Sequence, residues 1–370
     1  MRIVFLVVLV GCNSSSPPGG ATDHRDVDGS TLDATTVDGS MDASTDRRVD
    51  VDTDPPSFEA VWVDTSITVP DRELELRAHY PIGEGPFPLI VFSHGVWGSR
   101  EHYTAFAQHW ASEGYVVILP QHVDDDASMG EGTPFDDWPE RVGDITATLD
   151  ELEQLAVRAP ELAGRIDPSR VGVAGHSFGS YIAQLVAGVQ IRTSFGGPAT
   201  RVADPRVAAV LVLAPQGPGS QLADDAWDTL EIPVMSMTGS RDYGRLRFGE
   251  DVAWRLEPFR RARSTQKYLT FVSGLWNDYG GATETLLRPQ IEEYRARVAP
   301  GDAINEMHAW YIQRSSTAFW DAHLRGDPDA AAWLVNRELD VQSGGEAIVT
   351  SDPLDVDAIV ASLPPGPVSP

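Results

Sequence analysis

A serine framed by two glycines is the residue of this chain best suited to chemistry. Residues 175–179 read Gly-His-Ser-Phe-Gly, after a β-branched run at 170–174 and before a helix-forming run at 181–186. Strand, Gly-x-Ser-x-Gly and helix together form a nucleophile elbow, which exposes the serine hydroxyl beside a helix N-terminus. We therefore predict that Ser177 is a nucleophile and that Gly175 and Gly179 stand where no Cβ fits. The alternative is a glycine-rich turn whose serine only caps the helix.

A serine that attacks a carbonyl group also needs donors for the oxyanion that forms. One backbone N–H comes from the residue after the nucleophile and the other from an early strand-to-helix loop. A buried-strand run at residues 89–93 ends in His94-Gly95, before a helix expected over residues 100–113. The predicted donors are therefore Phe178 and Val96. We expect His94 to brace this loop by hydrogen bonding rather than to take part in the reaction.

The segment around the elbow resembles a known family. Residues 162–179 look like the dienelactone hydrolases, α/β hydrolases close to platelet-activating-factor acetylhydrolases and to cutinase-like polyester hydrolases. Four further segments fit the same pattern: Ser93-His94-Gly95, Asp204-Pro205-Arg206-Val207, Ala214-Pro215-Gln216-Gly217 and Thr317-Ala318-Phe319-Trp320-Asp321. The resemblance spans about residues 88–333. It implies a serine nucleophile and hydrolysis of carboxylic esters without a cofactor.

The order of apolar runs predicts the fold that must position these residues. Residues 58–69 and 72–80 read as an antiparallel pair, and strands follow at 88–93, 115–120, 170–174, 207–214, 232–238 and 267–272. Continuous apolar strands separated by helices indicate a parallel sheet covered on both faces. We therefore expect an α/β-hydrolase fold with a mostly parallel central sheet. Residues 138–159 and 304–325 read as long helices, and the tail after Asp340 as loosely docked.

The acid and base of a catalytic triad follow later in the chain, in the order serine, acid, histidine. Asp242 follows the strand at 232–238 and is the predicted acid, which would orient the base and stabilise its imidazolium. The resemblance places the histidine after the strand at 267–272, but Trp276 or Asn277 fills that slot. Of the two histidines after Asp242, His323 reads as a helix surface residue. His308 is the candidate base, and a plain helical histidine is the alternative.

The N-terminus reads as an export signal and a tether. Residues 1–10 form a short apolar run, and Leu9-Val10-Gly11-Cys12 resembles the lipobox of bacterial lipoproteins. Cys12 is the only cysteine, so we predict a lipid anchor there. Asn13 follows it rather than aspartate, and the resemblance to Gram-negative lipoproteins then implies placement in the outer membrane of the cell envelope. Residues 13–57 are rich in Asp, Ser and Thr and predict a disordered linker. The hydrolase domain is expected over residues 58–370.

Charge and composition narrow the class of partner. The formal net charge is −27, which disfavours nucleic acid as a partner. No cofactor fingerprint or zinc-site spacing stands in the sequence, so no cofactor and no metal is expected. The expected partner is a small-molecule or lipid-like ester, and the oligomeric state stays open.

Two other functions remain open from the sequence. Because the expected histidine is missing, the alternative is a catalytically impaired surface protein. Such a protein would bind esters, lipids or a partner through the cleft that holds substrate in an active hydrolase. An amidase or peptidase of the same fold is the lesser alternative. Retention of both Ser177 and Asp242 favours serine-dependent ester hydrolysis.

Overall fold

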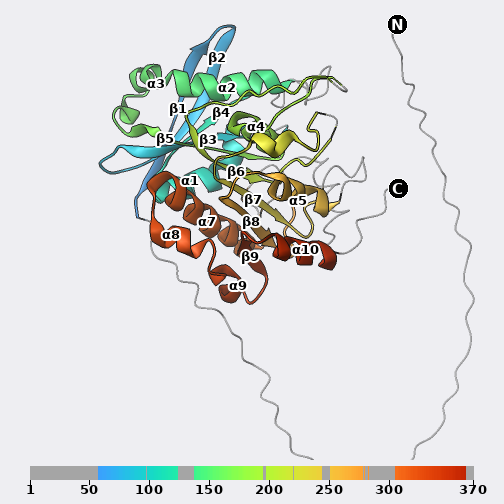
Figure 1. Ribbon diagram of the computed structural model, residues 1–370. Helices are drawn as coiled ribbons and strands as arrows, with labels where there is room; N and C mark the ends of the chain where they lie inside the picture. Colours follow the sequence, from blue (N-terminus) through green and yellow to red (C-terminus); the bar gives the residue numbers. More distant parts are fainter. Residues whose placement is uncertain are drawn as a thin grey trace, which may run out of the picture. The chain divides into compact units, whose positions relative to one another are not determined.

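A nine-stranded sheet organises the chain in the computed structural model (Figure 1). The structure describes residues 57–96, 98–123, 137–194, 197–219, 221–243, 251–277, 279, 282 and 305–363. The strands run in the order β1-β2-β4-β3-β5-β6-β7-β8-β9. They are β1 (Ala60–Val69), β2 (Arg72–Pro81), β3 (Phe87–Ser93), β4 (Val116–Pro120), β5 (Ile166–His176), β6 (Val207–Leu213), β7 (Val234–Gly239), β8 (Lys267–Val272) and β9 (Ala347–Thr350). From β4 to β8 all neighbours are parallel, and the pairs β1–β2, β2–β4 and β8–β9 are antiparallel.

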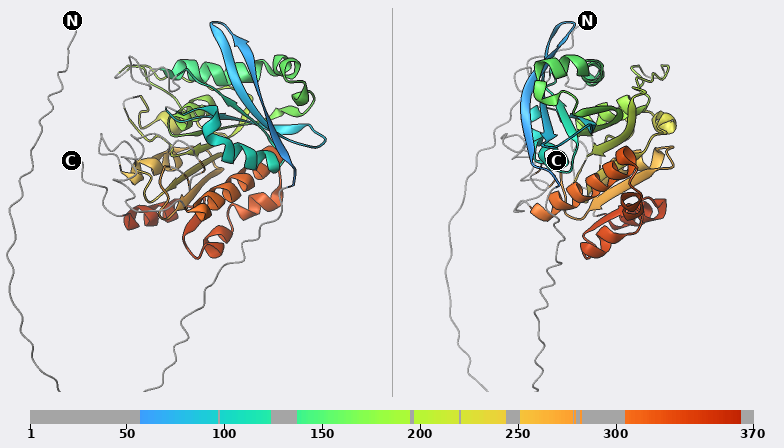
Figure 2. Two further views of the ribbon diagram at one scale, coloured as in Figure 1. Left: turned by 180° about the vertical axis from the view of Figure 1, so that it is seen from behind. Right: turned by 90° about the vertical axis from the view of Figure 1, so that its left-hand side faces the viewer.

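Helices cover both faces of this sheet (Figures 1 and 2). One face carries α2 (Trp138–Asp150), α3 (Leu152–Arg158), α4 (Phe178–Ala187), α5 (Val252–Arg261) and α10 (Pro353–Ser362). The other carries α1 (Thr104–Ser112), α7 (Glu306–Trp320) and α8 (Pro328–Trp333). The short α9 (Glu338–Gln342) leads into β9. The mostly parallel sheet covered on both faces that the sequence predicted is thereby confirmed.

Alternation along the central strands explains the two layers. In β3, Leu89 and Val91 join the core cluster under α2 and α4, whereas Ile90 and Phe92 join the cluster under α1 and α7. Successive side chains of a strand point to opposite faces, so a strand that is apolar throughout is buried on both sides. Every residue of β3 is buried. The carboxyl ends of β3 and β5 lie side by side, with Ser93 paired to Gly175.

Two elements differ from the sequence expectation. The helix expected over residues 138–159 is interrupted at Glu151, which separates α2 from α3. The expectation of a loosely docked tail after Asp340 is wrong for residues 341–363. There β9 pairs antiparallel with β8, and Val349 and Val356 are buried. A four-residue strand is too short for its alternation to stand out in the sequence, and its partner strand lies about 75 residues earlier.

The N-terminal predictions lie outside the described residues. These are the signal peptide, the lipid anchor at Cys12 and the linker that ends at residue 57. Within the described part of the chain, no helix combines the length and apolar character needed to cross a membrane.

Candidate active site

Ser177 occupies a sharp turn between β5 and α4. Its backbone has φ 53° and ψ −117°, a conformation that side-chain-bearing residues adopt at a cost of about 1–3 kcal/mol and that clusters at active sites. A Cβ on Gly175 would lie 2.1 Å from the carbonyl oxygen of Gly179, and one on Gly179 would lie 1.9 Å from that of Ser93. The two glycines therefore allow the turn to close, as the spacing predicted.

The turn exposes the serine and buries what surrounds it. Between residues 171 and 189, Ser177 is the one residue that is not buried. Its backbone N–H donates to the Leu213 carbonyl of β6 at 2.9 Å. The hydroxyl of Ser180 donates to the Ser177 carbonyl at 2.7 Å. A serine whose backbone is held at both its N–H and its carbonyl, and which is still partly exposed, is placed to attack a bound substrate.

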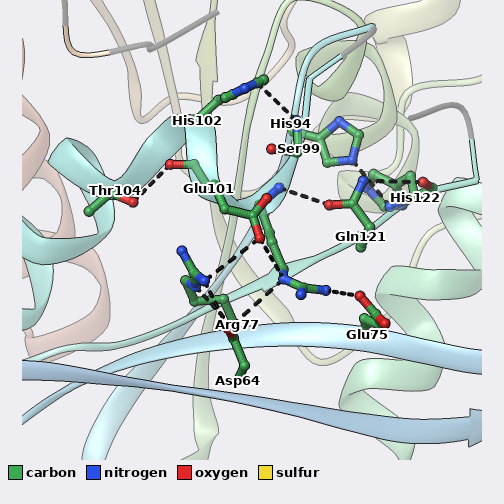
Figure 3. Close-up of polar contacts among 11 residues, drawn as sticks. Asp64, Glu75, Arg77, His94, Ser99, Glu101, His102, Thr104, Gln121 and His122 are labelled. Carbon is green, nitrogen blue, oxygen red and sulfur yellow. Dashed lines mark hydrogen bonds and ion pairs between the residues drawn. The ribbon is translucent and has the colours of Figure 1, made fainter. Parts of the chain in front are cut away.

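The loop after β3 carries Val96 and is anchored on both sides. On one side, His94 donates from Nδ1 to the Gly95 carbonyl at 2.8 Å and accepts the His122 backbone N–H at Nε2, 3.1 Å away. On the other side, the Ser99 N–H donates to His102 Nδ1 at 3.2 Å (Figure 3). Burial lowers the pKa of His94 well below its usual value. The neutral ring thus braces the loop, as expected for His94.

Asp242 is completely buried at the end of β7, with both carboxylate oxygens engaged. Oδ2 accepts the Thr238 hydroxyl at 2.9 Å. Oδ1 accepts the side-chain amide of Asn277 at 3.0 Å and lies 3.4 Å from Nε of Arg255. The carboxylate is therefore oriented towards the loop after β8, where the resemblance places a histidine.

Asn277 fills that slot. Trp276, the other residue the sequence left open, packs instead in the buried apolar cluster of α5 and β8. Asn277 donates its side-chain amide to Asp242. Burial lowers the pKa of the neighbouring His176 to about 3, and hydrogen bonding to Asn277 only partly opposes this shift. An amide orients its neighbours but cannot take a proton from Ser177 at neutral pH.

His308 lies in the first turn of α7 and is paired with a different carboxylate. Its Nε2 is 3.2 Å from Oε1 of Glu346, and its ring lies beside Gly274. The Asp242 carboxylate accepts hydrogen bonds from Thr238, Asn277 and Tyr279. The structure thus brings Ser177 and Phe178 together at the elbow and places His308 on Glu346. The role of His308 as base stays a prediction.

A polar cavity of about 600 Å³ opens next to the pair formed by His308 and Glu346. Arg241 and Tyr243, which flank the acid in sequence, line it together with Glu346 and glycines 274, 344 and 345. Among the described residues, no group of three or more His, Cys, Asp or Glu side chains is arranged to hold a metal ion.

Two buried arginines were missed in the sequence. Arg141 of α2 is fully buried and donates to the carbonyls of the loop before Val96. Arg255 of α5 donates to the Ala214 carbonyl at 2.7 Å and faces Asp242. Each stands on the apolar stripe of its helix, Arg141 four residues before the buried Ile145 and Arg255 four residues before the buried Phe259. A charged residue on such a stripe is the signal that could have revealed them.

The mostly parallel sheet covered on both faces, with Ser177 on its strained turn after β5 and Asp242 after β7, defines an α/β-hydrolase fold. The chain belongs to the α/β-hydrolase superfamily. Comparison with known families agrees: residues 65–135 match the model of platelet-activating factor acetylhydrolase, isoform II.

Curated relatives point the same way over part of their length. The chain is 27% identical over 143 residues to a Synechocystis protein named "Putative carboxymethylenebutenolidase", and 22% identical over 188 residues to a Methylorubrum extorquens protein of the same name. It is 32% identical over 94 residues to the Bacillus subtilis "Putative esterase YitV". These matches cover 36%, 49% and 25% of this chain and 58%, 60% and 36% of the respective relatives. The chain therefore spans less than two thirds of each of these proteins.

Proposed function

We propose that this chain hydrolyses carboxylic esters through an acyl-enzyme formed on Ser177. The observation that carries the proposal is the elbow itself: a strained serine, held by Leu213 and left accessible in a stretch that is otherwise buried. The family match and the names of the three relatives support ester hydrolysis. The substrate is a small-molecule or lipid-like ester.

In the proposed reaction, Ser177 Oγ attacks the acyl carbon and its proton passes to a base. The backbone N–H groups of Phe178 and Val96 bind the oxyanion, and collapse of the tetrahedral intermediate expels the alcohol, which takes up the proton. Water then attacks the acyl-enzyme, releases the acid and restores the hydroxyl. Asp242 orients the base. The sequence offered His308 for this role, but its pairing with Glu346 disfavours it.

The experiment is hydrolysis of short-chain p-nitrophenyl esters by the wild type beside Ser177→Ala. We expect loss of turnover with an unfolding midpoint close to that of wild type, since the side chain is small and the residue is partly exposed. A Ser177→Ala variant as fast as the wild type would remove Ser177 as the nucleophile.

A second function is favoured by one observation, the bond from Asn277 to Asp242. A site whose acid is held by an amide suits a catalytically impaired protein that binds ester-like or lipid-like molecules in the same cleft. Binding of a non-hydrolysable ester analogue by both wild type and Ser177→Ala, without turnover by either, would identify this case.

We further propose that the protein is anchored to the bacterial cell envelope through a lipid on Cys12. The support is the lipobox-like Leu9-Val10-Gly11-Cys12 at the end of an apolar run. Cys12→Ser should move the protein out of the detergent phase on phase partitioning. Unchanged partitioning would contradict lipidation.

A further inference from the structure

Arg141 connects the two halves of the oxyanion hole. It lies in the first turns of α2 and is fully buried. Nη1 donates to the His94 carbonyl at 2.5 Å, and Nη2 donates to the Gly95 carbonyl at 3.3 Å. The guanidinium carbon is 4.6 Å from the centroid of the Phe178 ring. One side chain therefore contacts both the loop that leads to Val96 and the residue after the nucleophile.

The contact with Gly95 controls the direction of the Val96 N–H. The Gly95 carbonyl and the Val96 N–H belong to one peptide unit, and in a planar trans peptide they point in opposite directions. Three donors hold that carbonyl: the Gly98 N–H at 3.0 Å, His94 Nδ1 at 2.8 Å and Arg141 Nη2. A carbonyl bound in this way polarises the N–H of its own peptide and strengthens it as a donor.

The contact with Phe178 acts on the other donor. A guanidinium over an aromatic face attracts the ring, more strongly when water is excluded, and the Phe178 ring is completely buried. Phe178 is the first residue of α4, so fixing its side chain fixes the backbone N–H beside Ser177. The same guanidinium also brings a positive charge that persists at every working pH, which stabilises a developing oxyanion in a poorly solvated site.

We propose that Arg141 is the positioning residue of the oxyanion hole, which aims both backbone donors and stabilises the tetrahedral oxyanion by its charge. The inference rests on the proposed function, because it assigns a role within the same reaction. It makes a distinctive claim: loss of Arg141 weakens binding of the tetrahedral state more than binding of the ester.

The test compares Arg141→Met and Arg141→Lys with the matched control Arg72→Gln in the full chain. Arg72 also contacts α2, through its 2.5 Å ion pair with Asp144. Asp144 in turn accepts from His122 Nδ1, whereas the carbonyls of His94 and Gly95 accept from Arg141. The readouts are kcat and KM for p-nitrophenyl acetate, inhibition by phenylboronic acid, which forms a tetrahedral adduct with a serine, and the unfolding midpoint.

For Arg141→Met we expect kcat to fall by about 100-fold or more, as on loss of an oxyanion donor, with KM within about threefold. The inhibition constant of phenylboronic acid should rise in parallel with the loss in kcat. Arg141→Lys should recover part of the loss because it keeps the charge. Arg72→Gln should retain kcat even where its unfolding midpoint falls as far.

Three results would overturn the inference. They are kcat within threefold of wild type in Arg141→Met, equal losses of kcat in the Arg72 control, or a loss confined to KM. If Arg141→Met does not fold, Arg141→Lys decides by the same criteria, with at least about a tenfold fall in kcat expected. Failure of the proposed function looks different, because the wild type itself would then neither turn over esters nor bind phenylboronic acid at Ser177.

Discussion

Asn277 donates its side-chain amide to the carboxylate of Asp242 across 3.0 Å, in the loop where the resemblance places a histidine. The carboxylate proposed as the acid is thus held in orientation by a group that cannot accept a proton. The buried guanidinium of Arg255 lies 3.4 Å from the same oxygen. Ser177, the proposed nucleophile, and Asp242, the proposed acid, are both present, and Asn277 occupies the position where the resemblance places the residue that would join them.

Asn277→His should raise ester turnover, because it puts an imidazole on the acid within reach of the elbow. General-base catalysis contributes about 10²–10⁴-fold, and we expect at least a tenfold gain in kcat, with activity rising as pH passes the imidazole pKa. Trp276→His is the matched control. Trp276 packs among Tyr243, Phe259 and Leu269, so that change should lower stability without a gain in rate. An Asn277→His variant no faster than wild type would show that the slot is not the site of the base.

His308→Ala asks whether another histidine has taken over. Because His308 is bonded to Glu346, we expect its removal to change kcat by less than about tenfold, and Glu346→Gln to have a similarly small effect. Triad members act as a unit, so a fall of about a thousandfold or more in His308→Ala, comparable to loss of Ser177, would instead establish His308 as the base.

The glycines of the elbow should tolerate no side chain. A methyl group on Gly175 would lie 2.1 Å from a backbone oxygen that cannot move without opening the turn. We therefore expect Gly175→Ala to lower the free energy of unfolding by more than about 4 kcal/mol.

Gly143 in α2 is the control, since a Cβ there meets nothing within 4 Å. Gly143→Ala should stabilise by about 0.5–1 kcal/mol. Urea unfolding of both variants checks the pair, and a Gly175→Ala protein as stable as wild type would contradict the packing described.

The fold was predictable because its signals are local. Each apolar run from β3 to β8 predicts a buried strand by itself, and the two glycines around Ser177 predict a tight turn. These local predictions are consistent with one fold. The partner of Asp242 was not predictable. The sequence does not show which of the neighbouring residues Asn277 and Trp276 contacts the carboxylate and which packs in the apolar cluster. The same holds for β9, which is a strand only because β8 offers it an edge. Arg141 and Arg255 needed the tertiary structure, since their partners are backbone carbonyls, which leave no trace in the sequence.

Buried neutral histidines should make the protein sensitive to acid. Burial lowers the pKa of His79 to about 4 and that of His176 to about 3, below the unfolded value of about 6.5. As pH falls, the unfolded chain therefore binds protons at these histidines before the native state does. The contribution of the neutral histidines to the free energy of unfolding is complete above about pH 6.5 and is lost as pH falls towards 4. Each such histidine adds a slope of up to about 1.4 kcal/mol per pH unit.

His79→Gln should reduce by about one the number of protons taken up on unfolding, and so lower the slope of the unfolding free energy against pH. Urea unfolding between pH 4.5 and 7.5 measures the slope of the unfolding free energy for wild type and variant. Equal slopes for the two proteins would show that His79 is protonated in the folded chain.

The most direct measurement of the central claim is covalent labelling of the full chain with a fluorophosphonate, followed by mass spectrometry of the labelled peptide. An activated serine at an oxyanion hole displaces fluoride from phosphorus and keeps the phosphonyl group. We expect a single adduct on Ser177, absent from Ser177→Ala and from heat-unfolded wild type, with loss of ester turnover in proportion to labelling. An unlabelled Ser177 in folded protein that still turns over esters would contradict it.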